Sequence, residues 1–166
     1  MPHSAIAGID VVAERNTQEV VIIRTFDASP HRVFDVYTSP ALIPRWWGPH
    51  RMTTVVEEME VRPGGRWRFV QHDPEGNTLI FHGVYHDIVA PKRIVSTFEF
   101  EGAPGHVSLD TATFAPAGSR TTLTIHSVFQ SVADRDGMLG AGMMDGLSES
   151  LQRIDAVLVQ RESANV

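Results

Sequence analysis

The eight histidines of the chain are the first residues to test for chemistry, because imidazole is a common metal ligand and proton carrier. Four of them fall in or beside segments that alternate like strands: His72, His82, His86 and His126. His82 and His86 would share one face, but four strand residues separate them by about 13 Å. Because zinc holds nitrogen ligands at about 2.1 Å, the pair cannot bind one ion, and we expect no metal site.

Acid–base catalysis in an apolar interior is the second chemistry to test. Glu57 and Tyr85 could form an acid–base pair of the kind a cyclase uses, and the strand register leaves open whether Glu57 or Glu58 points outward. The chain has no cysteine, and it contains no GxSxG motif, phosphate-binding loop or dinucleotide fingerprint. Thiol, nucleophilic and dinucleotide chemistry are therefore not indicated, and we expect no cofactor.

Composition narrows the protein class. The 166 residues fit one domain, and a net charge of −6 without a basic stripe argues against a nucleic-acid partner. The longest apolar run, Val20–Ile23, is far shorter than the roughly 20 residues of a membrane span, and the N-terminal segment lacks the cationic start of a signal peptide. We expect a cytoplasmic domain at 18–160, a loose segment at 1–17 and a tail at 161–166.

Start signals for a strand and two helices come first along the chain. The β-branched segment Val20–Phe26 predicts a strand. Ser29–Pro30 then offers a helix N-cap followed by a proline at the first helical position. Ser39–Pro40 repeats that signal, which predicts a second short helix that is broken near Pro44.

The long middle segment, Thr53–Phe129, consists of alternating runs separated by turn residues. Its connections are too short for crossover helices, so it predicts an antiparallel meander with one apolar and one polar face, in a sheet of six to seven strands. Ser131 and Asp134 form a capping-box-like start, and an apolar stripe follows. These features predict one helix from about Ser131 to Gln160 that covers the apolar face.

A cavity between that helix and the sheet is expected from their sizes. A helix is about 10 Å across, whereas six or seven strands spaced about 4.8 Å apart form a much wider layer. A curled sheet that grips the helix would resolve the mismatch and tend to leave a closed cavity of roughly 300 Å³ or more. Glycines weaken the start of the helix: Gly137, Gly140, Gly142 and Gly146. They allow close helix–sheet approach, mark a late helix start or leave room for a ligand.

The tryptophan pair of the run PRWWGPH raises the same choice. Neighbouring helix positions point about 100° apart, so we expect one of Trp46 and Trp47 to be buried against the sheet and the other to lie at the cavity mouth. Either both anchor the core, or at least one of them contacts a ligand.

Four runs in this order resemble the bacterial activator of heat-shock-protein-90 ATPase homologue family, within the START-like or SRPBCC superfamily: RTFDASPHRVFDVYTSPALIPRWWGP, VRPGGRWRF, GNTLIFHGVYHDIVAPKRIVST and GMMDGLSESLQRIDAVL. The resemblance covers about Val20–Leu158. It implies an α+β helix-grip fold, like that of the birch pollen allergen, with a curved antiparallel sheet around a long C-terminal helix. The superfamily includes lipid carriers, polyketide cyclases and aromatases, so the fold does not fix the function.

Three functions remain as hypotheses. The first is a binding protein that holds a small hydrophobic or aromatic molecule between the sheet and the C-terminal helix. The second is a cyclase-, aromatase- or hydrolase-type enzyme in the same cavity, and the third is a chaperone-associated or other protein-interaction module. An exposed edge strand makes a homodimer reasonable.

The candidate ligand-binding residues come from the apolar sheet face, the tryptophan pair and the start of the last helix. Four of them are polar groups that could orient a ligand: Gln71, Tyr85, Ser96 and Thr111. The others are apolar or small: Trp46, Trp47, Trp67, Phe69, Phe81, Phe98, Met138, Gly142 and Met143.

Overall fold

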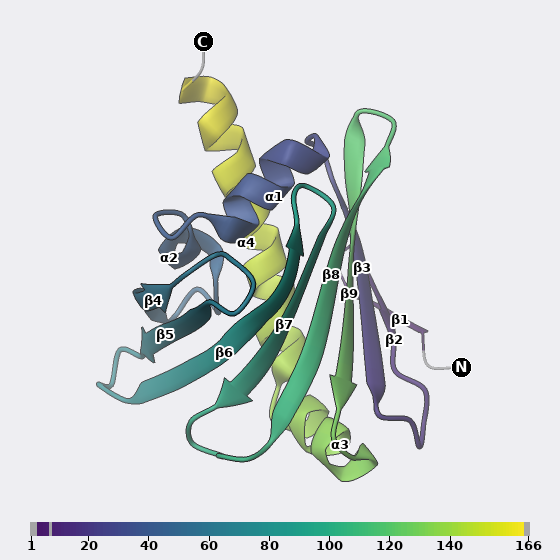
Figure 1. The fold of residues 1–166 in the computed structure, drawn as a ribbon, viewed down its shortest axis with the longest axis vertical. Helices are drawn as coiled ribbons and strands as arrows, with labels where there is room; N and C mark the ends of the chain where they lie inside the picture. Colours follow the sequence, from purple (N-terminus) through teal and green to yellow (C-terminus); the bar gives the residue numbers. More distant parts are fainter. Residues whose placement is uncertain (1–2, 7, 165–166) are drawn as a thin grey trace.

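A computed structural model describes the backbone of residues 3–6 and 8–164 and the side chains of residues 8–160. Its described part holds a nine-stranded sheet in the order β1-β2-β3-β9-β8-β7-β6-β5-β4, with every neighbouring pair antiparallel (Figure 1). The strands are β1 (His3–Ile6), β2 (Ile9–Val12), β3 (Glu19–Phe26), β4 (Thr53–Met59), β5 (Arg66–His72), β6 (Thr78–Val89), β7 (Arg93–Phe100), β8 (Val107–Ala117) and β9 (Arg120–Phe129). The predicted meander over the middle of the chain is confirmed.

In the described part of the segment expected to be loose (1–17), β1 and β2 add to the sheet beside β3. The alternation of β2 explains this, because Ile9 and Val11 face inward and are buried in the core. In the register they lie opposite Arg24 and Ile22 of β3. These two strands raise the count above the six to seven expected.

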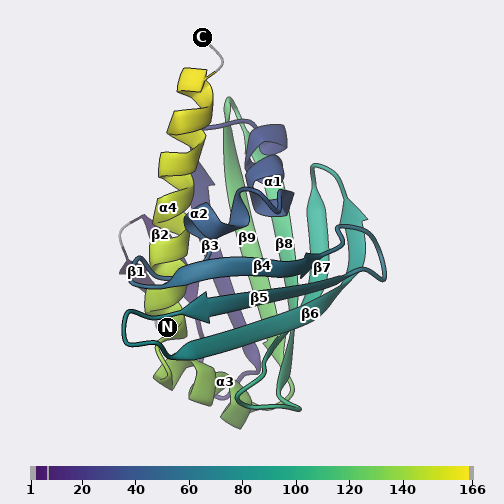
Figure 2. The same ribbon diagram turned by 90° about the vertical axis from the view of Figure 1, so that its left-hand side faces the viewer.

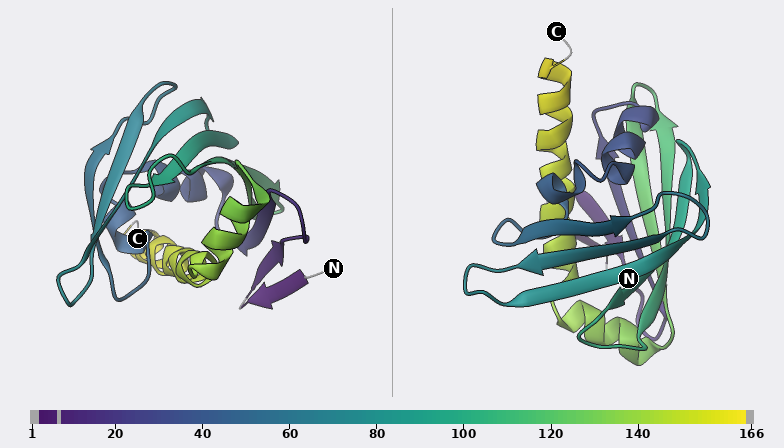
Figure 3. Two further views of the ribbon diagram at one scale, coloured as in Figure 1. Left: turned by 90° about the horizontal axis from the view of Figure 1, so that it is seen from below. Right: turned by 60° about the vertical axis from the view of Figure 1, so that its left-hand side comes forward.

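The sheet curls around the last helix, as the view from below shows (Figure 3). Two β-bulges contribute to the curl, one between Val56 and Glu58 of β4 and one between Tyr85 and Asp87 of β6. A bulge adds one residue to one strand of a pair and so bends and twists that strand. The helix-grip architecture expected from the resemblance is therefore confirmed.

Two short helices follow β3. Helix α1 (Pro30–Thr38) has Ser29 as its N-cap and a proline in its first turn, as predicted. Helix α2 (Ile43–Trp46) differs from the prediction, because Ser39 ends α1 and Pro44 lies in the first turn of α2. Proline lacks an N–H group and fits a first turn, where that group would have no partner, so Pro44 does not break the helix.

The single C-terminal helix predicted from Ser131 to Gln160 is instead two helices, α3 (Val132–Gly140) and α4 (Met143–Ala164). The Ser131 hydroxyl accepts a hydrogen bond from the backbone N–H of Asp134 at 3.0 Å, which confirms the start. The break falls at Gly142, whose φ of +88° belongs to the left-handed region that favours glycine. Helix α4 then crosses the concave face and continues into the tail expected at 161–166 (Figure 2).

Strand β8 faces the core with the opposite set of side chains from the set predicted, in which Thr111 pointed inward. Ala112 and Phe114 face inward and are buried, whereas Leu109 is 44% exposed on the outer face. The sequence of β8 has apolar residues in both phases of its alternation, so the pattern alone could not fix the inward face. Packing decides it, since the Phe114 ring contacts Phe34 of α1 at 5.3 Å.

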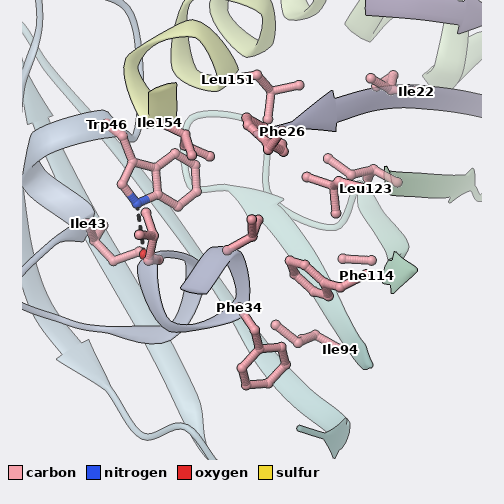
Figure 4. Packing of buried hydrophobic residues seen from close by; sticks show 14 of the residues in the cluster. Ile22, Phe26, Phe34, Ile43, Trp46, Ile94, Phe114, Leu123, Leu151 and Ile154 are labelled. Carbon is pink, nitrogen blue, oxygen red and sulfur yellow. Dashed lines mark hydrogen bonds between the residues drawn. The ribbon is translucent and has the colours of Figure 1, made fainter. Parts of the chain in front are cut away.

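The core lies where α1, α2 and α4 meet the β3, β8 and β9 region of the sheet (Figure 4). Its largest fully buried side chains include Phe26, Phe114, Ile43, Leu151 and Ile154. Side chains of this kind contribute about 1.5–3 kcal/mol each when fully buried, so this region anchors α4 against the sheet.

Candidate functional site

The two tryptophans at the end of α2 point in different directions. Trp46 is 2% exposed and donates its indole N–H to the Val36 carbonyl at 3.1 Å (Figure 4). Its ring lies 4.9 Å from the Tyr37 ring, on the α1 side of the core. Trp46 therefore anchors the core and has almost no surface left for a ligand.

Trp47 belongs to a group of rings on the inner face of the sheet, which we call the aromatic cluster. Its members are Trp47, Trp67, Phe69, Phe81, Phe98 and Phe100. The Trp47 ring lies edge-on to Phe69 at 5.1 Å and to Phe81 at 5.3 Å. Edge-to-face pairs of this kind contribute about 0.5–1.5 kcal/mol beyond their buried area. The sheet therefore brings together most of the apolar residues predicted for the site.

The Gly-Pro turn after the tryptophans fixes Trp47 against the cluster. Gly48 has a φ of +94°, and its backbone N–H donates to the Ser150 hydroxyl of α4 at 2.8 Å. Its carbonyl accepts a hydrogen bond from Arg153 Nη1 at 2.9 Å. On the sheet side, the Thr54 hydroxyl donates to the Trp47 carbonyl at 2.8 Å. The turn thus joins α4 to the edge of the sheet.

Gln71, a predicted ligand-orienting residue, supports this turn. Its side chain is 3% exposed, and its amide nitrogen donates to the Thr54 hydroxyl at 3.4 Å. The amide also lies directly under Gly48, where an added Cβ atom would meet Gln71 Nε2 at 1.9 Å. The Gln71 side chain therefore hydrogen-bonds and packs within the protein, where it supports the Gly48 turn.

A polar cluster lies on the inner face of the strands beside the aromatic cluster. Its members are Tyr37, Tyr85, Ser96, Ser108, Asp110 and Ser127. The strand register places Asp110 opposite Ser96 on one side and Ser127 on the other, and it places Ser96 opposite Tyr85. The Ser108 hydroxyl donates to Asp110 Oδ1 at 3.2 Å.

The ionisable groups of the polar cluster are strongly affected by their surroundings. Burial raises the pKa of Asp110 to about 6, and hydrogen bonds from Ser127 and Ser108 offset part of that effect. Burial, with the nearby Asp110 carboxylate, raises the pKa of Tyr37, and burial raises the pKa of Tyr85. Both tyrosines therefore keep their protons at neutral pH, while Asp110 is mostly ionised.

Asp110 is an acid of the interior that the alternation of its strand does not indicate. Because Thr111 was predicted to face inward, its neighbour Asp110 would face outward, and the packing of Phe114 reverses that arrangement. Glu57, the predicted partner of Tyr85, instead pairs with Arg68 on the outer face, and Glu58 lies 3.5 Å from Arg66. The acid that shares the interior with Tyr85 is Asp110, not Glu57.

The remaining predicted site residues divide between interior and surface. Tyr85 is buried, and Ser96, Met138 and Met143 are half-buried against the core. Thr111 points outward, opposite His126 of β9, because β8 is turned over. Gly142 forms the bend between α3 and α4, and an added Cβ atom there would meet nothing within 4 Å. Neither Thr111 nor Gly142 is placed to line the interior.

Two of the hollows on the described part of the molecule have defined linings, and neither of these two lies between the sheet and α4. One of about 370 Å³ lies between α2 and α4 and is lined by Arg45, His50, Gln152, Arg153, Ala156, Val157 and Gln160. The other, of about 250 Å³, involves β4, β5, β6 and Glu101 and is lined by Glu58, Arg66, Trp67, Arg68, His82, Gly83, Val84 and Glu101. The closed cavity expected from the sequence is not one of them.

Over the described ranges, no group of three or more His, Asp or Glu side chains is arranged to hold a metal ion. Among the described helices, none is both long and apolar enough to cross a membrane.

Comparison with protein families gives one match. The sequence model of the family described as "Activator of Hsp90 ATPase homolog 1-like protein" matches residues 27–159, which is most of the chain. Among curated proteins, none matches the chain.

Solved structures include many of the same fold. A solution structure of a protein from Arthrobacter aurescens has 29% identity and a TM-score of 0.84, with 90% of this chain and 91% of that chain covered. A crystal structure of a protein from Rhodobacter sphaeroides has 24% identity and a TM-score of 0.84, with 92% and 99% covered. The AHSA1 protein from Silicibacter pomeroyi has 20% identity and a TM-score of 0.73, with 86% and 99% covered. The last two likenesses concern the fold alone.

Proposed function

The chain belongs to the activator of Hsp90 ATPase homolog 1-like family, and from the chemistry of its interior we propose that it binds a small apolar or aromatic molecule between the sheet and α4. The observation that carries the proposal is the partial burial of side chains that face inward. Phe81 and Phe98 of the aromatic cluster face inward, yet both residues are only half-buried.

Partial burial of an inward-facing side chain means that a water-sized molecule still reaches it. The half-buried residues of this interior are Tyr37, Trp47, Phe81, Ser96, Phe98, Asp110, Met138, Met143, Met144 and Leu147. They contrast with the opposite end of the sheet, where Phe26, Leu123 and Leu151 are no more than 1% exposed. Because protein interiors are otherwise close-packed, this contrast favours a region that can admit a ligand.

The lining suits an apolar ligand. At about 25 cal/mol per Å², burying about 200 Å² of apolar ligand surface would contribute about 5 kcal/mol. Met138, Met143 and Met144 are unbranched and polarisable, so they can adjust to the shape of a guest. The polar cluster would fix the orientation of the ligand, as a few polar groups do in most apolar pockets.

The first experiment is native mass spectrometry of the purified protein, compared with its denatured mass. A discrete additional mass that is lost on denaturation would support the proposal and identify the ligand class. A protein without any additional mass, together with no binding of the naphthalene probes described below, would contradict it.

A substitution that fills the interior is expected to weaken ligand binding. Ser96 faces inward beside Asp110, so the leucine in Ser96→Leu would occupy ligand space and raise the Kd of an apolar probe such as 1-naphthylmethanol at least about tenfold. Thr111→Leu is the matched control, because Thr111 lies on the outer face of the adjoining strand. The control is expected to change the Kd less than about twofold, as measured by isothermal titration calorimetry. Equal effects of both variants would contradict the placement of the ligand.

An enzyme in the same interior is the second candidate function, and Asp110 is the observation that favours it. Acid–base catalysis needs a group whose pKa lies near the working pH, and burial brings that of Asp110 to about 6. Tyr37 and Tyr85 would act as hydrogen-bond donors to the reacting molecule. Chemical change of a co-purifying molecule that stops in Asp110→Asn would establish this function.

A protein-interaction module has less support. It needs a continuous apolar patch of several hundred Å² on the outer surface. The exposed large apolar side chains in the described part of the chain, Val55, Val89, Leu109 and Val159, lie on four different elements. A homodimer through an edge strand stays a prediction, with β4 and β1 at the two edges of the sheet.

A further inference from the structure

We infer that Asp110 is the recognition group of this interior and that the molecule it selects is an apolar or aromatic amine, whose protonated nitrogen pairs with the Asp110 carboxylate. This assignment rests on the proposed function and adds to it the charge of the ligand. Asp110 is the inward-facing acid at the centre of the polar cluster, between Ser96 of β7 and Ser127 of β9.

The Asp110 carboxylate has acceptor capacity that the protein does not use. An ionised carboxylate can accept about four hydrogen bonds. The hydroxyls of Ser108 and Ser127 are the side-chain donors to it. About two acceptor positions therefore remain for a donor that enters from the interior, and an ammonium group carries three N–H donors.

The described part of the protein also supplies no counter-charge to Asp110. Within the described residues, no arginine, lysine or histidine side chain forms a hydrogen bond or ion pair with it. The inward-facing cation of the sheet, Arg24, pairs with Asp155 of α4. Arg24 lies opposite Leu123 of β9, and Asp110 lies opposite Ser127 of the same strand. Four residues separate Leu123 from Ser127, which places these two positions about 13 Å apart. A carboxylate in an apolar interior without a counter-charge is costly, and a protonated amine would supply the missing charge.

A second buried cation, Arg135, is also bonded to other groups of the protein. Arg135 of α3 is 4% exposed, and its guanidinium bonds Asp136 at 2.7 Å, the Thr17 hydroxyl at 3.2 Å and the Glu14 carbonyl. It is therefore held toward the N-terminal segment and does not neutralise Asp110.

Aromatic rings beside the polar cluster could also attract the positive charge of a bound ammonium ion. In the register, Ser108 lies opposite Phe98 on one side and Phe129 on the other. The ring of Tyr37 lies 5.4 Å from that of Phe114, which is on the inward face of the same strand as Asp110. A ring face attracts an ammonium or aromatic ammonium ion, whereas an anionic ligand would be repelled by the carboxylate.

The pairing has a defined pH range. Burial raises the pKa of Asp110 to about 6, so the carboxylate is available above that pH and is lost as the pH falls through it. The titratable group that interacts with it is Tyr37 of α1, and Tyr85 of β6 lies beyond Ser96 in the register. Burial raises the pKa of both tyrosines, so they stay neutral over this range. On the helices that cover the sheet, Arg135 is bonded to Asp136 and does not neutralise Asp110. The Asp155 carboxylate is bonded to Arg24 and does not take the place of Asp110 as the partner of an amine.

The test compares three probes of one shape and different charge: 1-naphthylmethylamine, 1-naphthylmethanol and 1-naphthoic acid. At about pH 8, we expect the wild-type protein to bind the amine about tenfold to thirtyfold more tightly than the alcohol, and the acid most weakly. In Asp110→Asn, the Kd values of amine and alcohol should agree within about threefold. The control Asp27→Asn removes the same charge from an 87% exposed side chain and should keep the wild-type selectivity.

The pH profile of the wild-type protein tests the assignment without any substitution. The advantage of the amine over the alcohol should fall to about twofold or less between about pH 7 and pH 5. Equal binding of amine and alcohol at about pH 8, or selectivity that survives in Asp110→Asn, would overturn the assignment of Asp110 and leave the proposed binding function standing. Absence of binding by all three probes, with no co-purifying molecule, would overturn the binding function itself.

Discussion

Replacing Asp110 with asparagine is expected to stabilise the folded protein by about 2–3 kcal/mol at neutral pH. Burial raises the pKa of Asp110 from 3.8 to about 6, so ionising this carboxyl is harder in the folded state than in the unfolded state. Asparagine has nearly the same shape and can still accept hydrogen bonds from Ser108 and Ser127, but it carries no charge. The variant therefore removes an unfavourable ionisation from the folded state.

The pH dependence identifies the cause of this stabilisation. A carboxyl whose pKa is raised on folding favours the folded state when protonated, and that contribution is lost as the pH rises through its folded pKa. The difference in unfolding free energy between Asp110→Asn and wild type should be constant above about pH 7 and should approach zero below about pH 4.

Urea denaturation of both proteins at a series of pH values measures this difference, with Asp27→Asn as the control for net charge. The control should differ little from wild type, because Asp27 is 87% exposed. Destabilisation by Asp110→Asn at every pH would show that the carboxylate serves the fold itself, and a pH-independent gain would contradict the raised pKa.

Replacing Gly48 with alanine is expected to cost about 3 kcal/mol of folding free energy. A φ of +94° is unfavourable for any residue with a Cβ atom, at about 1–2 kcal/mol. The new Cβ atom would also lie 1.9 Å from Gln71 Nε2. Because Gln71 is buried, it could move aside only by giving up its hydrogen bond to Thr54.

Gly142→Ala is the matched control for backbone strain alone. Gly142 has a similar φ of +88°, but an added Cβ atom there meets nothing within 4 Å. This variant should cost only about 1 kcal/mol in urea denaturation. Gly48→Ala should also change the tryptophan fluorescence, since the turn positions Trp47 against the aromatic cluster. Equal costs for the two variants would show that Gln71 adjusts freely and that the turn does not depend on this contact.

Much of the fold could be read from the sequence because its signals are local. The Ser29–Pro30 start of α1, the alternating strands and the Ser131 cap of α3 each depend on residues within a few positions of one another. The resemblance of four sequence runs to one family added the helix-grip fold to these local signals. The aromatic part of the candidate site followed as well, since Trp67, Phe69, Phe81 and Phe98 alternate in strands with one clear apolar phase.

The polar part of the site depended on contacts between distant segments. Both phases of β8 carry apolar residues, so local alternation could not tell whether Thr111 or Asp110 faced inward, and the packing of Phe114 against α1 decided it. The inclusion of β2 in the sheet likewise depended on pairing with β3. Side-chain spacing along a strand restricts each residue to one of two faces, but only burial against other elements selects which face is inside, and here that selection placed a carboxylate in the interior.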